Sequence, residues 1–424
     1  VLKILNLAIG VRFPYRVQRR LQKSLFFCIF ASVMHRIVIA SDSFKGSLTS
    51  MEVAKAAAIG VNAALPDCMT TLLEIADGGE GTFQALTHHF NGKITETSVT
   101  DPLGRKINAS YGTAVINGRK TAIIEMAQAS GLTLLSPDER NPLHTSTYGT
   151  GEMILDAFRN GCRRFIIGIG GSATNDGGTG MLEALGFVFK DRDGQAIKGM
   201  CGGKIDQICS IEHLNVSRDI LEAEFIIACD VETPFCGLEG AAVVFGPQKG
   251  ATPEIVDKLE KGMQNLNSAI TKAYGTDLSD MEGSGAAGGL GGAFKACLGA
   301  ELRRGIDIVL DTIDFKEIIK DADLIITGEG RIDSQTAKGK VISGITSRAA
   351  EAGIPVIAMA GIVELSDKER SEMGLAGAYA IGPRPENESD LEYAMRPEVA
   401  SKRISETVAK VLESLSPSLF RANP

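Results

Sequence analysis

The strongest constraint on the fold is a repeated unit: a short, uninterrupted apolar run, then a glycine-rich or acidic segment, then a helical pattern. The apolar runs are Ile37 to Ala40, Phe165 to Ile169, Phe225 to Ala228, Leu324 to Ile326 and Val356 to Met359. Continuous rather than alternating hydrophobicity is typical of strands that are buried on both faces. The repeat therefore predicts a doubly wound α/β architecture with parallel strands, whose ligands bind at the carboxyl ends of those strands.

The first helical pattern has clear limits. Thr49 and Glu52 have the spacing of a capping box, an apolar stripe follows them, and Pro66 ends the pattern. A strand, a loop and a helix are thus expected in this order between residues 37 and 65.

The pattern changes between residues 93 and 128, where alternating segments and a turn at Asp101 to Gly104 predict antiparallel strands. The parallel pattern returns after about residue 290. We therefore expect two unlike α/β domains: a discontinuous Rossmann-like domain of residues 34–90 and 290–415, and an inserted mixed-sheet domain of residues 91–289. Residues 416–424 are expected to form a frayed tail.

Residues 1–33 carry basic side chains and no acidic ones, and they end in the apolar run Leu25 to Val33. That run is too short to cross a bilayer as a helix. We expect an extension that is disordered or mis-annotated, with Met34 as the natural start, and a targeting role is the alternative.

Charge and cysteine usage exclude several classes of protein. The formal net charge of -8 argues against a broad nucleic-acid surface, and no cysteine pair has the CxxC spacing of a zinc or redox site. The adjacent His88 and His89 would diverge on a helix and are not expected to bind one metal ion. We expect a reduced, cytoplasmic chain with neither nucleic acid nor membrane as a partner.

The most informative loop runs from Gly168 to Gly178 and follows a predicted buried strand. It matches neither a Walker A sequence nor GxGxxG, yet its glycines would let backbone amides approach phosphate oxygens, assisted by the N-terminus of the next helix. Asp176 is a candidate Mg²⁺ ligand, and a merely tight turn is the alternative reading. The predicted phosphate-binding residues are Gly170, Gly171, Ser172, Ala173, Thr174 and Asn175.

A second loop, Ala76 to Thr82, places Asp77 and Glu80 among glycines after another predicted strand. Crowded carboxylates become favourable when they share a cation or the proton of a hydroxyl group. Asp77 is therefore our candidate general base. The alternative is a helix N-terminus with Glu80 near its dipole.

A third loop, Thr327 to Asp333, contains Gly328, Glu329 and Gly330 as candidate cofactor-binding residues. Arg331 is a candidate for binding phosphate or the carboxylate of an acid substrate in bidentate fashion. The alternative is a surface ion pair of Arg331 with Asp333 or Glu329.

Two further segments carry candidate residues. In the loop after the first strand, Lys45 could neutralise a transferring phosphate and Asp42 could hold metal or act as a base. Lys249, next to Gln248, is a weaker candidate for an anion contact. The segment Gly283 to Gly292 is rich in small residues and is expected to serve close helix packing.

If these loops leave strands of shared sheets, their side chains converge on one edge. The chemistry then implied is transfer between an oxygen nucleophile and a polyanion, with Mg²⁺ as a partner. Taken together, Ser41 to Ser47, Ala76 to Thr82, Thr145 to Glu152, Gly168 to Gly178, Phe245 to Ala251 and Gly328 to Asp333 closely resemble the bacterial glycerate kinase family, over about nine tenths of the chain.

The resemblance implies an ATP-dependent kinase that acts on D-glycerate and gives 2-phosphoglycerate, with two unlike α/β domains and an active site in the cleft between them. We expect Lys45 and the backbone of Gly170 to Asn175 to hold the ATP phosphates, and Asp176 and Asp230 to share Mg²⁺. A homodimer is left open. A kinase of another small hydroxy acid or sugar acid, and a non-catalytic binding protein that senses such acids, are the alternatives.

Overall fold

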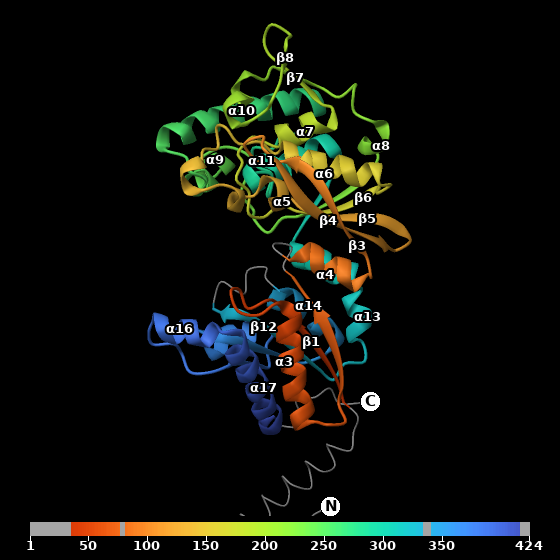
Figure 1. Ribbon diagram of the computed structural model, residues 1–424, viewed down its shortest axis with the longest axis vertical. Helices are drawn as coiled ribbons and strands as arrows, with labels where there is room; N and C mark the ends of the chain where they lie inside the picture. The colour runs from red at the N-terminus through yellow and green to blue at the C-terminus, as the bar shows by residue number, and fades with distance from the viewer. Residues whose placement is uncertain (1–34, 77–80, 334–340, 416–424) are drawn as a thin grey trace, which may run out of the picture. The chain divides into compact units, whose positions relative to one another are not determined.

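The computed structural model describes residues 35–76, 81–333 and 341–415 (Figure 1). The chain divides into two compact units, one made of Val1–Glu74 and Lys316–Pro424 and the other of Ile75–Phe315. This division follows compactness alone, and the domain limits predicted near residues 90 and 290 stay predictions. Each unit is described by itself below.

The first unit is built on a five-stranded sheet with the order β14-β13-β12-β1-β2, and all its strand pairs are parallel. Its strands are β1 (Arg36–Ser41), β2 (Met69–Glu74), β12 (Leu324–Ile332), β13 (Val356–Val363) and β14 (Gly377–Ala380). The chain proceeds from β1 to β2 in one direction and from β12 to β13 and β14 in the other. The order therefore reverses between β1 and β12, and such a switch point is where open α/β sheets bind ligands.

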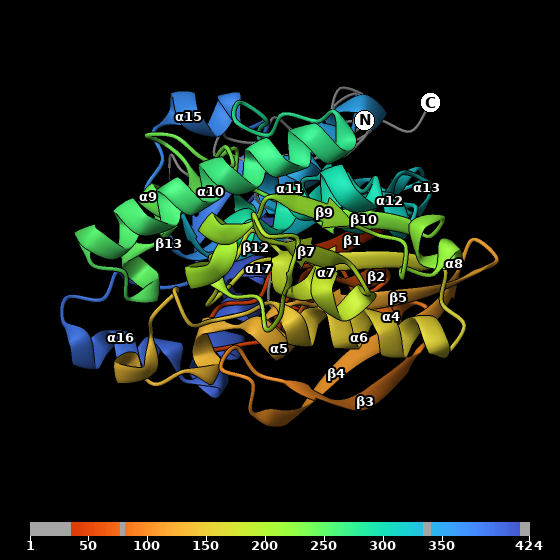
Figure 2. The same ribbon diagram turned by 90° about the horizontal axis from the view of Figure 1, so that it is seen from above.

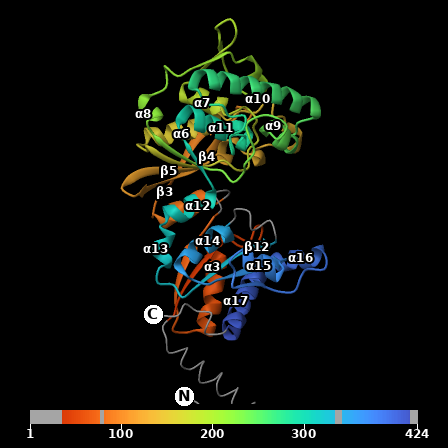
Figure 3. The ribbon, with the colours of Figure 1, turned by 180° about the vertical axis from the view of Figure 1, so that it is seen from behind.

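Helices cover both faces of this sheet, because right-handed crossovers in opposite directions place α3 and α14 on opposite sides. Helix α3 packs with α17 over the core made by β1, β12 and β13 (Figure 1). Helix α14 contacts β1, β12 and β13 and is visible from behind in Figure 3. The helices of this unit are α3 (Ser50–Ala64), α14 (Val341–Ala352), α15 (Asp367–Glu372), α16 (Glu388–Met395) and α17 (Pro397–Ser414), and α13 (Phe315–Ile319) spans the boundary.

The start of α3 confirms the predicted capping box. The hydroxyl of Thr49 accepts from the backbone N–H of Glu52, and the carboxylate of Glu52 accepts from the backbone N–H of Thr49 at 2.8 Å. These bonds satisfy amides that the first helical turn leaves unpaired.

The predicted glycine loop after Ile326 is wrong, because β12 continues to Ile332. The ladder with β13 extends as far as Ile332 opposite Val363. Gly328 allows this close pairing, since a Cβ there would lie 2.4 Å from the carbonyl oxygen of Met359. Gly328, Glu329, Gly330 and Arg331 therefore lie on a strand, where glycine serves backbone approach rather than a turn.

The second unit is built on a mixed six-stranded sheet with the order β11-β10-β6-β5-β4-β3. The pairs from β5 to β11 are parallel, and β3, β4 and β5 are antiparallel neighbours, as the alternating pattern predicts. Figure 2 shows β3 and β4 side by side. The strands are β3 (Lys93–Thr100), β4 (Lys106–Ile116), β5 (Arg119–Glu125), β6 (Arg164–Gly168), β10 (Glu224–Ala228) and β11 (Glu301–Arg303).

A small antiparallel sheet and a set of helices complete this unit around one core. The small sheet consists of β7 (Val188–Lys190), β8 (Ala196–Ile197) and β9 (Ser210–Glu212). The helices are α4 (Thr82–His89), α5 (Ala127–Ser130), α6 (Tyr148–Arg159), α7 (Thr179–Leu185), α8 (Arg218–Leu221), α9 (Ala241–Phe245), α10 (Pro253–Tyr274), α11 (Ala286–Leu298) and α12 (Gly305–Thr312). Short 3₁₀ segments lie at Leu132–Leu134, Pro137–Glu139, Gly202–Gln207 and Pro247–Lys249.

The predicted fold class is confirmed: a discontinuous, doubly wound parallel sheet in one unit and a mixed sheet in the other. Within the described residues, every helix is too short or too polar to cross a membrane.

Candidate functional site

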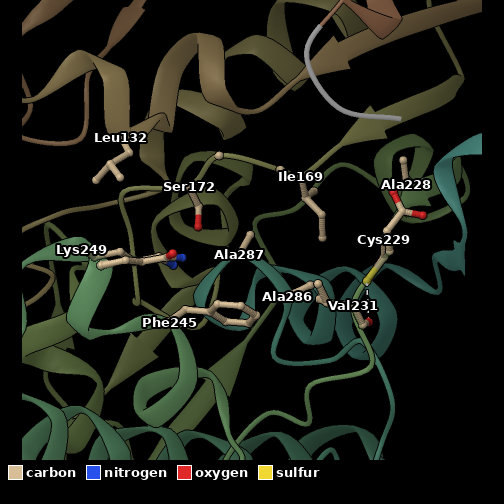
Figure 4. A pocket seen from close by; sticks show the side chains of 14 residues that line it. Leu132, Ile169, Ser172, Ala228, Cys229, Val231, Phe245, Lys249, Ala286 and Ala287 are labelled. Carbon is tan, nitrogen blue, oxygen red and sulfur yellow. Dashed lines mark hydrogen bonds between the residues drawn. The ribbon is translucent and has the colours of Figure 1, made fainter. Parts of the chain in front are cut away.

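A cavity of about 470 Å³ lies in the second unit, where β6 and β10 end (Figure 4). The register places Gly168 opposite Ala228, so the chain leaves these two strands side by side. The cavity is lined by Ile169 to Ser172 from the first exit and by Ala228 to Val231 from the second. The rest of the wall comes from Leu132, Phe245, Gln248, Lys249, Ala286 and Ala287.

The predicted phosphate loop forms part of this wall, and backbone hydrogen bonds to the segment Ser130 to Leu132 hold it in place. The N–H of Ala173 donates to the carbonyl of Ser130, and the N–H of Leu132 donates to the carbonyl of Gly171, both at 2.9 Å. Gly171 has a φ of 73°, which glycine adopts without strain. A Cβ at Gly170 would meet no atom within 4 Å, so a ligand could approach this backbone closely. The role of the loop in binding phosphate stays a prediction.

The predicted contribution of the following helix to phosphate binding is wrong for α7. Its first amides are already used: the N–H groups of Gly178 and Gly180 donate to the carboxylate of Asp176 at 3.1 and 3.2 Å. The negative charge of Asp176 already compensates the N-terminus of α7, so this helix terminus is not available to a phosphate.

Asp176, predicted as a metal ligand, is completely buried. Besides the two glycine amides, its carboxylate accepts from the backbone N–H and the hydroxyl of Thr147, both at 2.8 Å. Burial raises the pKa of Asp176, and the hydrogen bonds from Thr147, Gly178 and Gly180 lower it. A carboxylate with four donors on its two oxygens would have to exchange them to bind a cation.

Lys249 is buried although it is a lysine, with 2% of its surface exposed, and it lines the cavity. Its ammonium group donates to the carbonyl oxygen of Thr174 at 2.7 Å. Burial lowers the pKa of Lys249 to about 7, and the charge of Asp176 acts in the opposite direction. Figure 4 shows the side chain directed into the space between Ser172 and Phe245. Among the described residues that line the cavity, Lys249 is the one with a cationic side chain.

Asp230, the second predicted metal ligand, differs from Asp176. It lines the cavity and is exposed, and one carboxylate oxygen accepts from the N–H of Gly305 at 2.9 Å. In Figure 4 its neighbours in sequence, Cys229 and Val231, lie on the side of the cavity away from Lys249. The described parts of the chain contain no group of three or more His, Cys, Asp or Glu side chains that could hold a metal ion.

In the first unit, candidate residues from the loop after β1 and from β12 meet at the switch point. The N–H of Asp42 and the hydroxyl of Ser41 both donate to the carbonyl of Gly328 at 2.9 Å. Lys45 is exposed, and a Cβ on Gly330 would lie 4.0 Å from its backbone nitrogen. Ser41 thus joins the end of β1 to the middle of β12 by a hydrogen bond.

Two candidate carboxylates, those of Glu329 and Asp42, belong to this edge. Glu329 is buried, with 5% of its surface exposed. Asp42 accepts from the N–H of Ser43 at 2.7 Å, which is a local turn rather than a ligand site by itself. Their catalytic and cofactor-binding roles stay predictions.

Arg331 forms the ion pair that was the alternative to its predicted role. Its guanidinium group lies 3.2 Å from the carboxylate of Asp333 and also contacts that of Glu364, which in turn pairs with Arg384. Arg331 is about half exposed. An acid substrate would therefore have to replace one of these carboxylates.

Asp77, the predicted base, lies outside the described residues together with Gly78, Gly79 and Glu80. At the helix that follows, Gly81 has a φ of 89° and precedes α4. The N–H of Phe83 in the first turn of this helix donates to the buried carboxylate of Glu125 at 3.2 Å. The sequence interpretation missed Glu125, which ends β5 beside Gly168 of β6.

The segment predicted only to pack helices also shapes the cavity. Ala287, Gly288 and Gly289 all have positive φ within α11, and this turn places Ala286 and Ala287 in the cavity wall. The carbonyl of Gly288 accepts from the N–H of Gly177 at 2.9 Å. The glycine pairs Gly288-Gly289 and Gly291-Gly292 are the available signal for such a kink.

We expect Gly288→Ala to destabilise the protein by about 3 kcal/mol, because overpacking adds to backbone strain. A Cβ there would lie 2.1 Å from the carbonyl oxygen of Thr174. Gly299→Ala is the matched control: its φ is also positive, at 66°, but nothing lies within 4 Å of its Cβ. Urea denaturation measures both, and equal losses of stability would show that the contact with the phosphate loop contributes nothing.

Comparison with known proteins gives a consistent result. The glycerate kinase family model matches residues 37–416. A glycerate kinase of Bacillus subtilis (strain 168) is 46% identical over 82% of this chain and 90% of the relative. A glycerate 2-kinase of Escherichia coli (strain K12) is 45% identical over 77% of this chain and 85% of the relative.

A solved structure is also similar. A crystal structure assigned to glycerate kinase 2 of Salmonella typhimurium LT2 superposes with a TM-score of 0.77 at 41% sequence identity. The match covers 89% of this chain and 97% of the other. The similarity therefore extends over nearly the whole of both folds.

Proposed function

The chain belongs to the glycerate kinase family and is a kinase, and on that premise we propose that it transfers the γ-phosphoryl group of ATP to D-glycerate. We propose the 2-hydroxyl as acceptor, giving 2-phosphoglycerate, which is supported by the relative named glycerate 2-kinase. The observation that carries the ATP assignment is the cavity in which a buried lysine faces a glycine loop at the end of a parallel strand.

The nucleotide fits this cavity by its chemistry. The ring of Phe245 and the side chains of Val231 and Ile169 form apolar wall, which suits a base. Lys249 and the backbone of Gly170 to Ser172 supply positive charge and amides, which suit phosphates. Ala173, Thr174 and Asn175 follow in the same loop but are buried behind the cavity wall, and their contact with phosphate stays a prediction.

The transfer itself breaks the bond between the γ-phosphorus and the bridging oxygen of ATP and forms a bond from that phosphorus to the glycerate oxygen. The proton of the hydroxyl goes to Asp77, our proposed base, and ADP leaves with the electron pair. In the first unit, we propose that Lys45 neutralises the charge of the transferring phosphate. At the switch point, we propose Asp42 as a further base or metal ligand, and the strand residues Gly328, Glu329 and Gly330 as cofactor-binding residues.

Mg²⁺ fits only one of the two predicted ligands. Asp230 is exposed and lines the cavity, and one of its carboxylate oxygens accepts from the N–H of Gly305, whereas Asp176 is fully buried and accepts four hydrogen bonds inside the protein. We propose that Asp230 helps to hold Mg²⁺, which would neutralise phosphate charge when it is bound. A single carboxylate is common for Mg²⁺ with nucleotides, because the phosphates and water supply the other ligands.

Arg331 is our proposed contact for the glycerate carboxylate. We expect Arg331→Lys to raise the KM for glycerate about tenfold with a smaller change in kcat, because lysine keeps the charge but loses the bidentate geometry. Arg192→Lys, an exposed arginine of the second unit, is the control. Steady-state kinetics with varied glycerate measures both, and an unchanged KM for glycerate removes Arg331 from substrate binding.

The proposal is tested by ADP release with D-glycerate, L-glycerate, tartronate and sugar acids as acceptors, followed by phosphorus NMR of the product. We expect D-glycerate to give the highest kcat/KM and the product signal of a 2-phosphate. A higher kcat/KM with another acid would favour a different acid kinase. Ligand binding without ADP release from any acceptor would favour a sensor.

A further inference from the structure

The buried carboxylate of Asp176 joins the beginnings of two helices. Thr147 is the residue before α6, and Gly178 is the residue before α7. Both donate to Asp176, and the hydroxyl of Thr147 also accepts from the N–H of Met181 at 2.9 Å. The carboxylate therefore fixes the place where the phosphate loop ends and α7 begins.

Lys249 holds the same loop through one of the loop's carbonyl groups. Its ammonium group bonds the carbonyl oxygen of Thr174, two residues before Asp176. Asp176 and Lys249 are both buried and their charges interact, so each offsets part of the cost of burying the other. The end of the loop is thus fixed from two sides, and only Lys249 of the two reaches the cavity.

We infer that Asp176 is a positioning residue: together with Lys249 it fixes the Gly170 to Asn175 loop for nucleotide phosphates, and it acts through that loop rather than as a metal ligand. The inference rests on the proposed function, since it takes the loop as the phosphate site. It replaces the metal role predicted for Asp176 and leaves Asp230 as the carboxylate at the cavity.

The geometry argues against direct metal binding by Asp176. Three donors point to one carboxylate oxygen and one donor to the other, all from backbone or hydroxyl groups of the protein. Moving these donors would disturb the starts of α6 and α7. A positioning role needs no such movement, because the hydrogen bonds are already those of the folded loop.

Titration calorimetry of ATP binding with Asp176→Asn and Thr147→Val, in Mg²⁺ and in EDTA, separates the two roles. Thr147→Val removes a hydroxyl that bonds Asp176 but keeps the shape of the side chain. We expect the ATP affinity of both variants to fall about tenfold in Mg²⁺ and also in EDTA, because a misplaced loop binds phosphate poorly with or without metal. The double variant should bind ATP about as tightly as the single variant with the lower ATP affinity, since both changes break the same hydrogen-bond network.

Thr121→Val is the matched control, because Thr121 is also fully buried but its hydroxyl group donates to the carbonyl of Arg119, away from Asp176. Weaker ATP binding by Asp176→Asn in Mg²⁺ alone, with Thr147→Val unaffected, would assign Asp176 to the metal and overturn the inference. Unchanged ATP affinity in both variants, with a lower melting temperature, would overturn it as well, because the role would then be structural only. Thr147→Val keeps the test available if Asp176→Asn does not fold.

Failure of the proposed function is distinguishable from failure of this inference. Binding of ATP is measured without glycerate, whereas the proposed function is measured as transfer to an acceptor. A wild-type protein that binds ATP but phosphorylates no acid would contradict the proposed function and leave the role of Asp176 testable.

Discussion

Replacing Lys249 by methionine lowers kcat/KM for ATP about 10²–10³-fold, because a preorganised cation in a buried site stabilises phosphate charge far better than water does. Lys249 is 2% exposed and is the cationic side chain of the described cavity wall. Methionine is also long and unbranched, so it fills the same space without the charge. The loss is therefore expected in nucleotide binding and turnover rather than in folding.

The stability of Lys249→Met reflects two opposing effects. Burial lowers the pKa of Lys249 to about 7, so the folded protein disfavours its charged form. Removing the ammonium group removes that cost, but it also removes the hydrogen bond to Thr174 and the charge that compensates Asp176, so we expect a folded protein with a lower melting temperature. Lys258→Met, on the exposed surface of α10, is the control for an ordinary lysine. Unchanged kcat/KM in Lys249→Met would exclude Lys249 from nucleotide binding.

The pH dependence of ATP affinity follows from the same side chain. Below about pH 7 Lys249 is protonated in the free protein, so phosphate meets an ammonium group. Above that pH, Lys249 must take up a proton when ATP binds, and the affinity for ATP falls by up to about tenfold per pH unit. The charge of Asp176 opposes this loss of affinity, because it favours the protonated form of Lys249. The other titratable groups among the described residues that line the cavity are Asp230 and Cys229. Lys249→Arg should bind ATP with a flatter pH profile, since arginine stays protonated.

Asp77→Asn lowers kcat about 10²–10⁴-fold with the KM for ATP unchanged, because the amide cannot accept the proton of the attacking hydroxyl. In the sequence, Asp77 stands among glycines directly after Ile75 and Ala76, two buried residues that follow β2. Asparagine has nearly the same shape as aspartate, so the substitution mainly removes the charge and the proton acceptor. Steady-state kinetics with saturating glycerate measures the change.

The control for Asp77→Asn is Asp67→Asn, which changes an exposed carboxylate in the turn after α3. Normal turnover in Asp67→Asn together with the loss in Asp77→Asn supports the base assignment. Wild-type turnover in Asp77→Asn removes Asp77 from the mechanism. A lowered kcat that is accompanied by an equal loss of ATP affinity would instead place Asp77 at the nucleotide.

The fold could be predicted from local patterns where one pattern dominated. Uninterrupted apolar runs identified β1, β6, β10, β12 and β13, because strands buried on both faces need no polar side. The end of β12 was wrong because glycine is ambiguous: at Gly328 it permits close pairing with β13 instead of a turn. Sequence alone does not distinguish these two uses of glycine.

The candidate site was predicted less completely, since burial and pairing depend on distant residues. Lys249 was a weak candidate because nothing local shows that it is buried against Thr174. The sequence predicts Asp176 as a metal ligand because its partner Thr147 is 29 residues away in the chain and nothing local shows their hydrogen bond. Ala287 lines the cavity through a left-handed turn that small residues permit but do not specify.

A crystal structure with a non-hydrolysable ATP analogue and Mg²⁺ will show whether ATP phosphates bind between Lys249 and the Gly170 to Asn175 loop. We expect a phosphate oxygen within about 3 Å of the Lys249 ammonium nitrogen, with the base near Phe245. An analogue bound elsewhere, with the cavity beside Lys249 holding only water, would contradict it.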